Sequence, residues 1–418
     1  MLNVEGSYFT FTGFEITGGG HGIRLGNANN AVIEDMTIHA IADVGISCNR
    51  PGHVCDRLTV RRNEIYDTGG RGEGMYIGCN DNACQVTNSL FAENFIHDLG
   101  GDQGDGIEIK TGSYGNTVRD NVIVNALYPA ITLYGFPDGA GPFNVVERNF
   151  IWGTINNGIQ IVGQVIVRNN IIVDAGLNGI QSKPSQGFEP HDVTIVHNTV
   201  YASGTACMKT NDWSGSANQV IANNAFYCAG SAAADINGGA PGATIVGNIG
   251  LGSISAPGGI ELGAGDADLG NPATNVFYPP TGSVLIDSGD SAQGASEDYN
   301  GSARGDGSPD VGAYEHTAPE NPGWMLAAGF RGDVPDPPPP MTDGGVGPLP
   351  DGGVTPPPDG GGVTDSGSSP DDDAGSGVDS GGGGESDGGC GCRTTSGPGS
   401  SAAWFALLMV VTLFRRRR

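Results

Sequence analysis

Short apolar strands recur along the first 250 residues, separated from one another by polar turns. Residues 104–122, GDGIEIKTGSYGNTVRDNV, show the pattern clearly, with a strand GIEI, a turn TGSYG and a second strand NTVR that ends near Asn121. Alternation within GIEI places the two isoleucines on one face and Glu108 and Lys110 on the other. This period of two indicates strands with one buried face, and no stretch of this region carries a helical period.

The same unit is repeated about ten times. A small or polar residue marks the corner of each repeat, at Gly13, Asp35, Asn63, Asn94, Asn121, Asn149, Asn170, Asn198, Asn224 and Asn248. The nine spacings lie between 21 and 31 residues. A period of this length, in phase with apolar strands, predicts a solenoid. Asn suits a corner because it tolerates a left-handed backbone and its amide can bond the next amide in a ladder. We therefore predict an all-β parallel β-helix of about ten coils.

Composition divides the chain into four parts. We expect the parallel β-helix in residues 1–250, and less regular C-terminal coils with a cap in residues 251–316. Residues 317–389 are dominated by Pro, Gly, Asp, Ser and Thr and cannot bury a core, which predicts a disordered linker. The last part, 390–418, combines a cysteine motif, an apolar run and four arginines.

This C-terminal part has the features of a surface anchor. GCGC, the apolar run AAWFALLMVVTLF and RRRR follow one another, and a basic cluster would hold the inner end of a membrane-spanning helix. The order resembles the C-terminal sorting signal of myxobacterial surface proteins, which implies that Cys390 or Cys392 is the anchoring residue. A plain transmembrane anchor is the alternative. Because Met1 leads directly into strand sequence, we expect that a secretory signal peptide is missing from the N-terminus, and we predict a cell-surface or extracellular protein.

Charge and cysteines limit the partners and the compartment. The net charge of −27 argues against nucleic-acid binding, which needs a basic face. Four cysteines bracket two short polar loops, CNRPGHVC and CNDNAC. Loop-closing disulfides within Cys48–Cys55 and Cys79–Cys84 are the expected outcome in an oxidising compartment; zinc binding is the less favoured alternative. Cys207 and Cys228 lie one coil apart, and a disulfide between them is possible.

The repeat resembles the right-handed parallel β-helix of the pectate-lyase-like superfamily over roughly residues 3–250. In that superfamily a polysaccharide lies along the outward face of one strand ladder, and the GIEI-type strands are the corresponding ladder here. Its outward positions imply substrate-binding candidates at Arg24, Tyr76, Gln160 and Gln181.

The densest group of outward residues predicts a lyase-type site. A polysaccharide lyase removes a proton next to a uronate carboxylate, so it needs charge neutralisation, a base and an acid. Lys110 is the candidate base or neutralising cation, Tyr134 the candidate acid, and Lys183, further along the same row, a third catalytic candidate. Calcium is a possible cofactor, with Asp102, Asp105 and Glu108 as hard oxygen ligands. The alternative is a solvated face with a simple Glu–Lys pair.

A comparison of motifs leaves this assignment open. EIKTGSYGN at 108–116 resembles the Glu- and Lys-bearing strand of the alginate lyase and chondroitinase B group. In that group the catalytic Lys lies a few residues further on, where this chain has Ser113 or Tyr114.

The segment before the linker carries a second group of charged residues. Asp298, Arg304, Asp306, Asp310 and Glu315 occur among turns that end in the strand VGAY. We expect them to bond the turns of the cap, with a calcium site as the alternative.

Three functions are compatible with these features. The first is a surface-anchored protein that binds and cleaves uronate polysaccharide by β-elimination. The second is a non-catalytic carbohydrate-binding or adhesive module, and the third is a structural surface protein. Fold alone does not decide between them.

Overall fold

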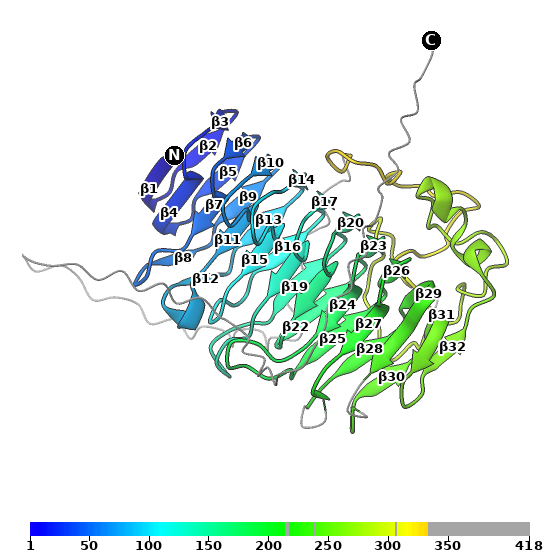
Figure 1. Ribbon diagram of the computed structural model, residues 1–418. Helices are drawn as coiled ribbons and strands as arrows, with labels where there is room; N and C mark the ends of the chain where they lie inside the picture. Colours follow the sequence, from blue (N-terminus) through cyan, green and yellow to red (C-terminus); the bar gives the residue numbers. More distant parts are fainter. Residues whose placement is uncertain (214–216, 237–239, 306, 333–418) are drawn as a thin grey trace, which may run out of the picture. The chain divides into compact units, whose positions relative to one another are not determined.

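The computed structural model describes residues 1–332 except 214–216, 237–239 and 306. Within this part, the predicted repeats form coils that stack side by side from the N-terminus toward β32 (Ile260–Leu262) (Figure 1). Equivalent strands of successive coils pair in parallel, as β11 (Met75–Ile77) does with β15 (Ile107–Ile109). The predicted all-β parallel β-helix of about ten coils is confirmed.

Each coil contributes strands to three ladders. The first ladder consists of β2 (Thr10–Thr12), β5 (Val32–Glu34), β9 (Thr59–Arg61), β13 (Leu90–Ala92), β16 (Thr117–Arg119), β19 (Asn144–Glu147), β22 (Val165–Arg168), β25 (Val193–Val196), β28 (Val220–Ala222) and β30 (Thr244–Val246). The second ladder consists of β3 (Glu15–Thr17), β6 (Thr37–Ile41), β10 (Glu64–Thr68), β14 (Phe95–His97), β17 (Val122–Val124), β20 (Phe150–Trp152), β23 (Ile171–Val173), β26 (Thr199–Tyr201), the starts of β29 (Ala225–Ile236) and β31 (Asn248–Ser255), and β32.

The third ladder contains the GIEI-type strands. It consists of β1 (Leu2–Ser7), β4 (His21–Asn29), β7 (Val44–Cys48), β11, β15, β18 (Ile131–Leu133), β21 (Ile159–Ile161), β24 (Asn178–Ser182), β27 (Ala206–Thr210) and the ends of β29 and β31. Short strands β8 (Val54–Asp56) and β12 (Gln85–Thr87) pair beside it, and the 3₁₀ turns are η1 (Asn80–Asn82), η3 (Asp266–Leu269) and η4 (Pro272–Thr274). Inward side chains of all three ladders form one continuous apolar core.

A buried asparagine ladder links the coils at one corner. Asn121 Nδ2 donates to Asn149 Oδ1 and to the Phe91 carbonyl, both at 2.9 Å, while Asn121 Oδ1 accepts from Asn94 Nδ2 at 2.9 Å. The left-handed residue is the preceding one, as at Asp120 (φ 56°). The predicted ladder is therefore confirmed, but the asparagine itself does not make the left-handed turn.

The predicted corners of the first two coils are one residue out of register. Met36, and not Asp35, takes the place of Asn63, because the Met36 N–H donates to Asn63 Oδ1 at 3.1 Å. Asp35 is the left-handed residue of its coil (φ 54°), and Gly13 (φ 73°) holds the same position one coil earlier. A turn residue and a ladder residue are adjacent in sequence, and the pattern alone does not separate them.

The segment after β32 lies along the side of the coils. Figure 1 shows the course of this segment beside the coils. Its apolar residues pack on the outward face of the second ladder, and this second cluster includes Val122, Phe150, Ile171, Ala225, Ile249, Phe277, Leu285, Tyr299, Tyr314 and Leu326. Of residues 251–316, predicted as further coils and a cap, the end of β31 and β32 continue the coils, and the residues after β32 lie along their side. The structure also corrects the linker boundary at 317, because Leu326 and Arg331 are buried against the coils.

Arg331 fixes the end of this lateral segment. Its guanidinium pairs with the buried Asp120 carboxylate, donates to the Arg148 carbonyl at 2.8 Å and lies 4.1 Å from the centre of the Tyr299 ring. Arg148 pairs with the same carboxylate at 2.9 Å. Two arginines therefore share one buried carboxylate, and loss of either one leaves the other to neutralise it.

We predict that Arg331→Ala detaches the end of the lateral segment. Because Arg148 still neutralises Asp120, we expect a loss of about 2 kcal/mol and not the full cost of a broken buried pair. Limited proteolysis should show faster cleavage after residue 317 while the coils stay intact. Arg57→Ala, which removes a side chain that is 60% exposed, is the control; equal cleavage of both variants and wild type would contradict the prediction.

Disulfides close the two polar loops as predicted. Cys48 bonds to Cys55 and Cys79 bonds to Cys84, and a third bridge joins Cys207 to Cys228 across neighbouring coils. Within residues 1–332, leaving aside the gaps given above, no helix is long and apolar enough to cross a membrane. The predicted span and both anchoring cysteines, Cys390 and Cys392, lie outside the described residues.

Candidate functional site

The outward residues of the third ladder form a continuous row. Tyr76 pairs in register with Glu108, Glu108 with Thr132, and Thr132 with Gln160. Gln181 and Lys209 continue the row. Met208, which the alternation places outward in its coil, points into the core, because Ile180 is its register partner.

Lys110 lies at the centre of a polar cluster beside this row, level with Tyr134 of the next coil. Its ammonium donates to Glu108 Oε1 at 2.6 Å and lies 4.9 Å from the centre of the Tyr76 ring and 4.5 Å from that of Tyr134. The Tyr134 hydroxyl donates to the same Glu108 oxygen at 3.1 Å. The two rings and the carboxylate therefore surround one cation, an arrangement that combines cation–π contacts with a charge-assisted hydrogen bond.

Two further carboxyl groups complete what we call the Lys110 cluster, which consists of Glu73, Tyr76, Asp105, Glu108, Lys110 and Tyr134. Asp105 accepts a hydrogen bond from Thr132 Oγ1 at 2.7 Å. Glu73 is 0% exposed, and neither of its carboxylate oxygens has a hydrogen-bond partner among the described residues; the same holds for Glu108 Oε2. A buried carboxylate without partners is costly, so the protonated form of Glu73 is favoured.

Burial and neighbouring charge raise the pKa values of four members of this cluster. Burial, reinforced by the Glu108 charge, raises the pKa of Glu73 to about 7 and raises the pKa of Asp105 well above its ordinary value. Burial and the Glu108 charge likewise raise the pKa of the Tyr76 and Tyr134 hydroxyls. Both tyrosines are therefore proton donors at neutral pH, and Glu73 can change protonation state near pH 7.

We predict that ionisation of the buried Glu73 carboxyl group lowers the free energy of unfolding as the pH rises. Its folded-state pKa is raised above the unfolded value of 4.5, so the folded state holds the proton more tightly and stability falls between pH 4.5 and about 7. The shift corresponds to about 3 kcal/mol. Glu73→Gln should flatten this dependence and raise the melting temperature most at pH 8. Glu15→Gln, at an exposed carboxylate, is the control, and a wild-type pH profile in Glu73→Gln would refute the assignment.

The predicted calcium ligands do not fit a metal site. Asp102 is exposed, Asp105 bonds Thr132, and Glu108 Oε1 is occupied by Lys110 and Tyr134. No group of three or more Asp, Glu, His or Cys side chains in the described part of the chain is arranged to hold a metal ion. Only Asp102 is set apart from the other two, because it is exposed whereas Asp105 and Glu108 are buried in the Lys110 cluster.

The remaining predicted site residues lie along the row and outside the cluster. Arg24 donates to Asn49 Oδ1 at 3.1 Å. Gln160 and Gln181 both accept hydrogen bonds from the Asn157 amide, at 3.2 and 2.9 Å. Lys183 is half-buried, and burial lowers its pKa. It follows Lys110 by three coils, which is about 14 Å, so it does not belong to the same reaction centre.

A serine, a histidine and a carboxylate meet at the N-terminal end of the row. Ser47 Oγ lies 3.2 Å from His21 Nδ1, and His21 Nε2 lies 3.6 Å from Asp43 Oδ2. Burial lowers the pKa of His21. Ser47 is fully buried, and a nucleophile must reach the substrate, so this arrangement is a structural one in the observed conformation.

A long loop passes the C-terminal ends of the cluster strands. After β24 the chain folds back so that Gln186 Nε2 donates to Asn80 Oδ1 at 3.2 Å, although 106 residues separate them. Phe188 of this loop packs directly against Gly135, next to Tyr134. The cluster is correspondingly enclosed: Glu108 and Lys110 are each only 4% exposed, while Tyr134 is half-buried.

Glu73 is the one cluster residue that the sequence interpretation missed. The signal was present, because GEGMYI at 72–77 aligns with GDGIEI at 104–109, and this alignment places Glu73 at the position of Asp105. The backbone confirms it, since the Gly74 N–H donates to the Asp105 carbonyl and the Met75 N–H to the Gly106 carbonyl.

The charged residues of the lateral segment stabilise its turns. Asp298 accepts hydrogen bonds from the backbone of Ser302 at 2.7 Å and Glu315 at 2.9 Å, and Arg304 pairs with the Glu315 carboxylate at 2.7 Å. Asp310 accepts from the Asp287 backbone at 2.8 Å. These contacts agree with the structural interpretation, and Asp306 lies outside the described residues.

The family described as "Right handed beta helix region" matches residues 2–123. Together with the parallel ladders, this match defines the class of the protein as a right-handed parallel β-helix. A search of curated protein sequences finds no match.

Solved structures with a similar fold include three enzymes. Pectate lyase Pel9A is 15% identical, with 71% of this chain and 73% of that chain covered and a TM-score of 0.43. An alginate lyase from Paenibacillus sp. is 19% identical, with 48% and 70% covered and a TM-score of 0.34. A mutant of the periplasmic alginate epimerase AlgG is 17% identical, with 47% and 46% covered and a TM-score of 0.38. At these values the likeness assigns no activity.

Proposed function

We propose that the protein processes polysaccharide, and that the Lys110 cluster cleaves uronate polymers by β-elimination. The observation that carries the proposal is the shared contact of Lys110 and Tyr134 with one buried carboxylate, Glu108. A cation, a protonated hydroxyl and a carboxylate oxygen without a partner are thereby held side by side, and these are the groups that such an elimination needs.

Each group has a defined part in the proposed reaction. The Lys110 ammonium pairs with the uronate carboxylate and makes the neighbouring C5 proton more acidic. Glu108 Oε2 takes this proton, the C4–O bond breaks, and a C4=C5 double bond forms. Tyr134 gives its hydroxyl proton to the departing oxygen. Rotation of the Glu108 carboxyl group then brings this proton to the Tyr134 oxygen and restores both groups, so the net transfer is from C5 to the leaving group.

Substrate must reach groups that are almost fully enclosed. The loop that carries Gln186 and Phe188 closes the C-terminal side of the cluster, and we infer that this loop shifts when a sugar chain binds. Arg24, Gln160 and Gln181 then provide polar contacts further along the row. No step is assigned to calcium, because the predicted ligands do not fit a site.

A test of this function uses the full chain, produced in an oxidising compartment. Pectate, alginate and glycosaminoglycans are incubated with it, with calcium and with a chelator, and ultraviolet absorbance reports unsaturated uronate. Product from at least one polymer is expected. Absence of product from all of them would contradict the proposal; loss of product only with chelator would establish the calcium dependence predicted from sequence.

The enclosure of Glu108 and Lys110 favours a second candidate, a non-catalytic carbohydrate-binding or adhesive surface module. In that case the full chain binds a polymer without cleaving it.

We further propose display at the cell surface through residues 390–418. Three disulfides support an oxidising compartment. Fractionation of cells that make the full chain, or a variant lacking 390–418, tests the anchor: release of the truncated protein into the medium is expected.

A further inference from the structure

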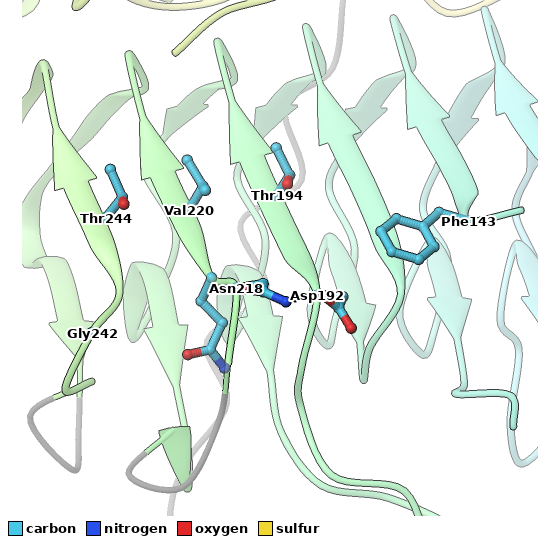
Figure 2. A pocket seen from close by; sticks show the side chains of 8 residues that line it. Phe143, Asp192, Thr194, Asn218, Val220, Gly242 and Thr244 are labelled. Atoms are coloured by element: carbon cyan, nitrogen blue, oxygen red, sulfur yellow. Dashed lines mark hydrogen bonds between the residues drawn. The ribbon is translucent and has the colours of Figure 1, made fainter. Parts of the chain in front are cut away.

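A pocket of about 410 Å³ opens on the first ladder, where strands β25, β28 and β30 begin. Figure 2 shows that Phe143 stands at one side of this pocket, while Asp192 and Asn218 lie at the strand starts and Thr194 and Thr244 project from the strands. The Lys110 cluster is carried by the third ladder, so the two places belong to different faces of the coils.

The pocket combines an aromatic face with short polar side chains. Phe143 is 41% exposed, so one face of its ring is accessible to a ligand. Asn218 Nδ2 donates to Asp192 Oδ1 at 2.7 Å, and the other Asp192 oxygen lies 2.8 Å from His191 Nδ1. An apolar ring beside fixed, planar hydrogen-bonding groups suits the two surfaces of a pyranose, its C–H face and its equatorial hydroxyls.

Gln219 belongs to the wall of the pocket and occupies an inward position of its coil, because Val220 is in register with Thr194 and Gln219 is therefore level with the core residue Val193. It lines the pocket and is only 2% exposed. Its Nε2 donates to the Pro190 carbonyl at 3.1 Å, whereas its Oε1 has no hydrogen-bond partner among the described residues. This oxygen is closed off from solvent, so Gln219 shapes the wall of the pocket and receives no ligand contact here.

Charge narrows the class of ligand. The lining contains one carboxylate, Asp192, and neither Lys nor Arg. An anionic sugar would meet repulsion there because the lining has no Lys or Arg to compensate, while a neutral sugar can donate its hydroxyls to Asp192. This preference is opposite to that of the Lys110 cluster, where an ammonium group is held ready for a carboxylate.

We propose that the pocket beside Phe143 is a binding site for a neutral sugar unit of a polysaccharide. It is separate from the reaction centre and does not depend on catalysis there. Strand starts of three successive coils line it, and coil spacing of about 4.8 Å allows consecutive sugar units to contact consecutive coils. The protein thereby holds neutral glycan on one face and uronate on another.

Affinity electrophoresis of the full chain in gels containing xylan, mannan or mixed-linkage glucan tests this site, with pectate as the anionic comparison. Wild type is expected to be retarded by at least one neutral polymer, and Phe143→Ala to bind it about tenfold more weakly. Phe14→Ala removes an exposed ring on the N-terminal coil and should leave binding unchanged, as should Lys110→Ala. Thr194→Arg, which fills the pocket from its floor, should abolish binding.

Circular dichroism and thermal melting confirm that the variants are folded. Three results would overturn the proposal: no retardation of wild type by any neutral polymer, equal retardation of wild type and both pocket variants, or retardation by pectate that Phe143→Ala reduces to the same degree. Because Lys110→Ala should keep this binding, failure of the lyase assay and failure of the pocket are distinguishable.

Discussion

Replacement of Lys110 by alanine is expected to remove nearly all cleavage of uronate polymer. Lys110 donates to Glu108 and lies between the rings of Tyr76 and Tyr134. Its loss takes away the only cation that we assign to the substrate carboxylate. General acid–base groups contribute about 10²–10⁴-fold to rate, and we expect kcat to fall by about 10³-fold. Initial rates of unsaturated product formation provide the measurement.

Tyr134→Phe separates a chemical role from a structural one. The substitution removes one hydroxyl and keeps the ring against Lys110, so the fold should be unaffected while kcat falls about 10²–10³-fold and KM changes little. Lys209→Ala, at a lysine of the neighbouring outward row that pairs with Asp235, is the matched control for Lys110→Ala. Wild-type kcat in Tyr134→Phe would contradict the role of its hydroxyl as the acid.

Replacement of Asn121 is expected to give the largest loss of stability among single polar substitutions in the coils. Its amide is fully buried and takes part in hydrogen bonds with Asn94, Asn149 and the Phe91 carbonyl. Asn121→Ala leaves these buried groups unpaired at 1–3 kcal/mol or so each, partly offset by relaxation. We expect a loss of about 3 kcal/mol, measured by chemical unfolding.

An exposed asparagine serves as the control for this prediction. Asn80→Ala removes a side chain on the surface of η1 and should cost no more than about 0.5 kcal/mol. If Asn121→Ala were equally mild, the ladder would not be the main link between coils at this corner. The stability of the stack would then rest on the apolar core alone.

The coils were predictable because their physics repeats. Inward isoleucines and valines recur at fixed positions in the coils, and their burial stabilises each of the roughly ten coils in the same way. The position of Asp35 was assigned one residue too early because the sequence does not distinguish a left-handed turn residue from the buried amide that follows it. Only the hydrogen bond from Met36 to Asn63 separates the two.

The lateral segment was not predictable from a repeat. Phe277, Tyr299 and Tyr314 have no common period, and their burial depends on the outward face of the second ladder, which is apolar from Val122 to Ile249. That face could have indicated a covering segment, since strands with apolar residues on both faces are buried on both. The identity of the segment that covers it follows only from the tertiary contacts.

The strand that carries the candidate site was predictable from the sequence, but the full set of its residues was not. Glu108 and Lys110 lie on the outward face of one strand, as alternation requires, and Tyr134 lies beside Lys110 on the next coil. Asp102 does not join them, and Glu73 does. Asp102 was predicted because it is close to Glu108 in sequence, whereas Glu73 belongs to the site because it lies on the neighbouring coil. The enclosing loop comes from Gln186, three coils away along the stack, and no local pattern indicates where such a loop folds.

The most direct test of the proposed β-elimination is digestion of a uronate polymer by the full chain in water labelled with oxygen-18, followed by mass spectrometry of the fragments. Elimination adds no water. The account therefore predicts fragments that carry an unsaturated uronate at one end, are one water lighter than hydrolysis products and contain no label. Saturated fragments that carry one labelled oxygen would show hydrolysis and contradict the role assigned to Lys110, Glu108 and Tyr134, and an intact polymer would contradict cleavage itself.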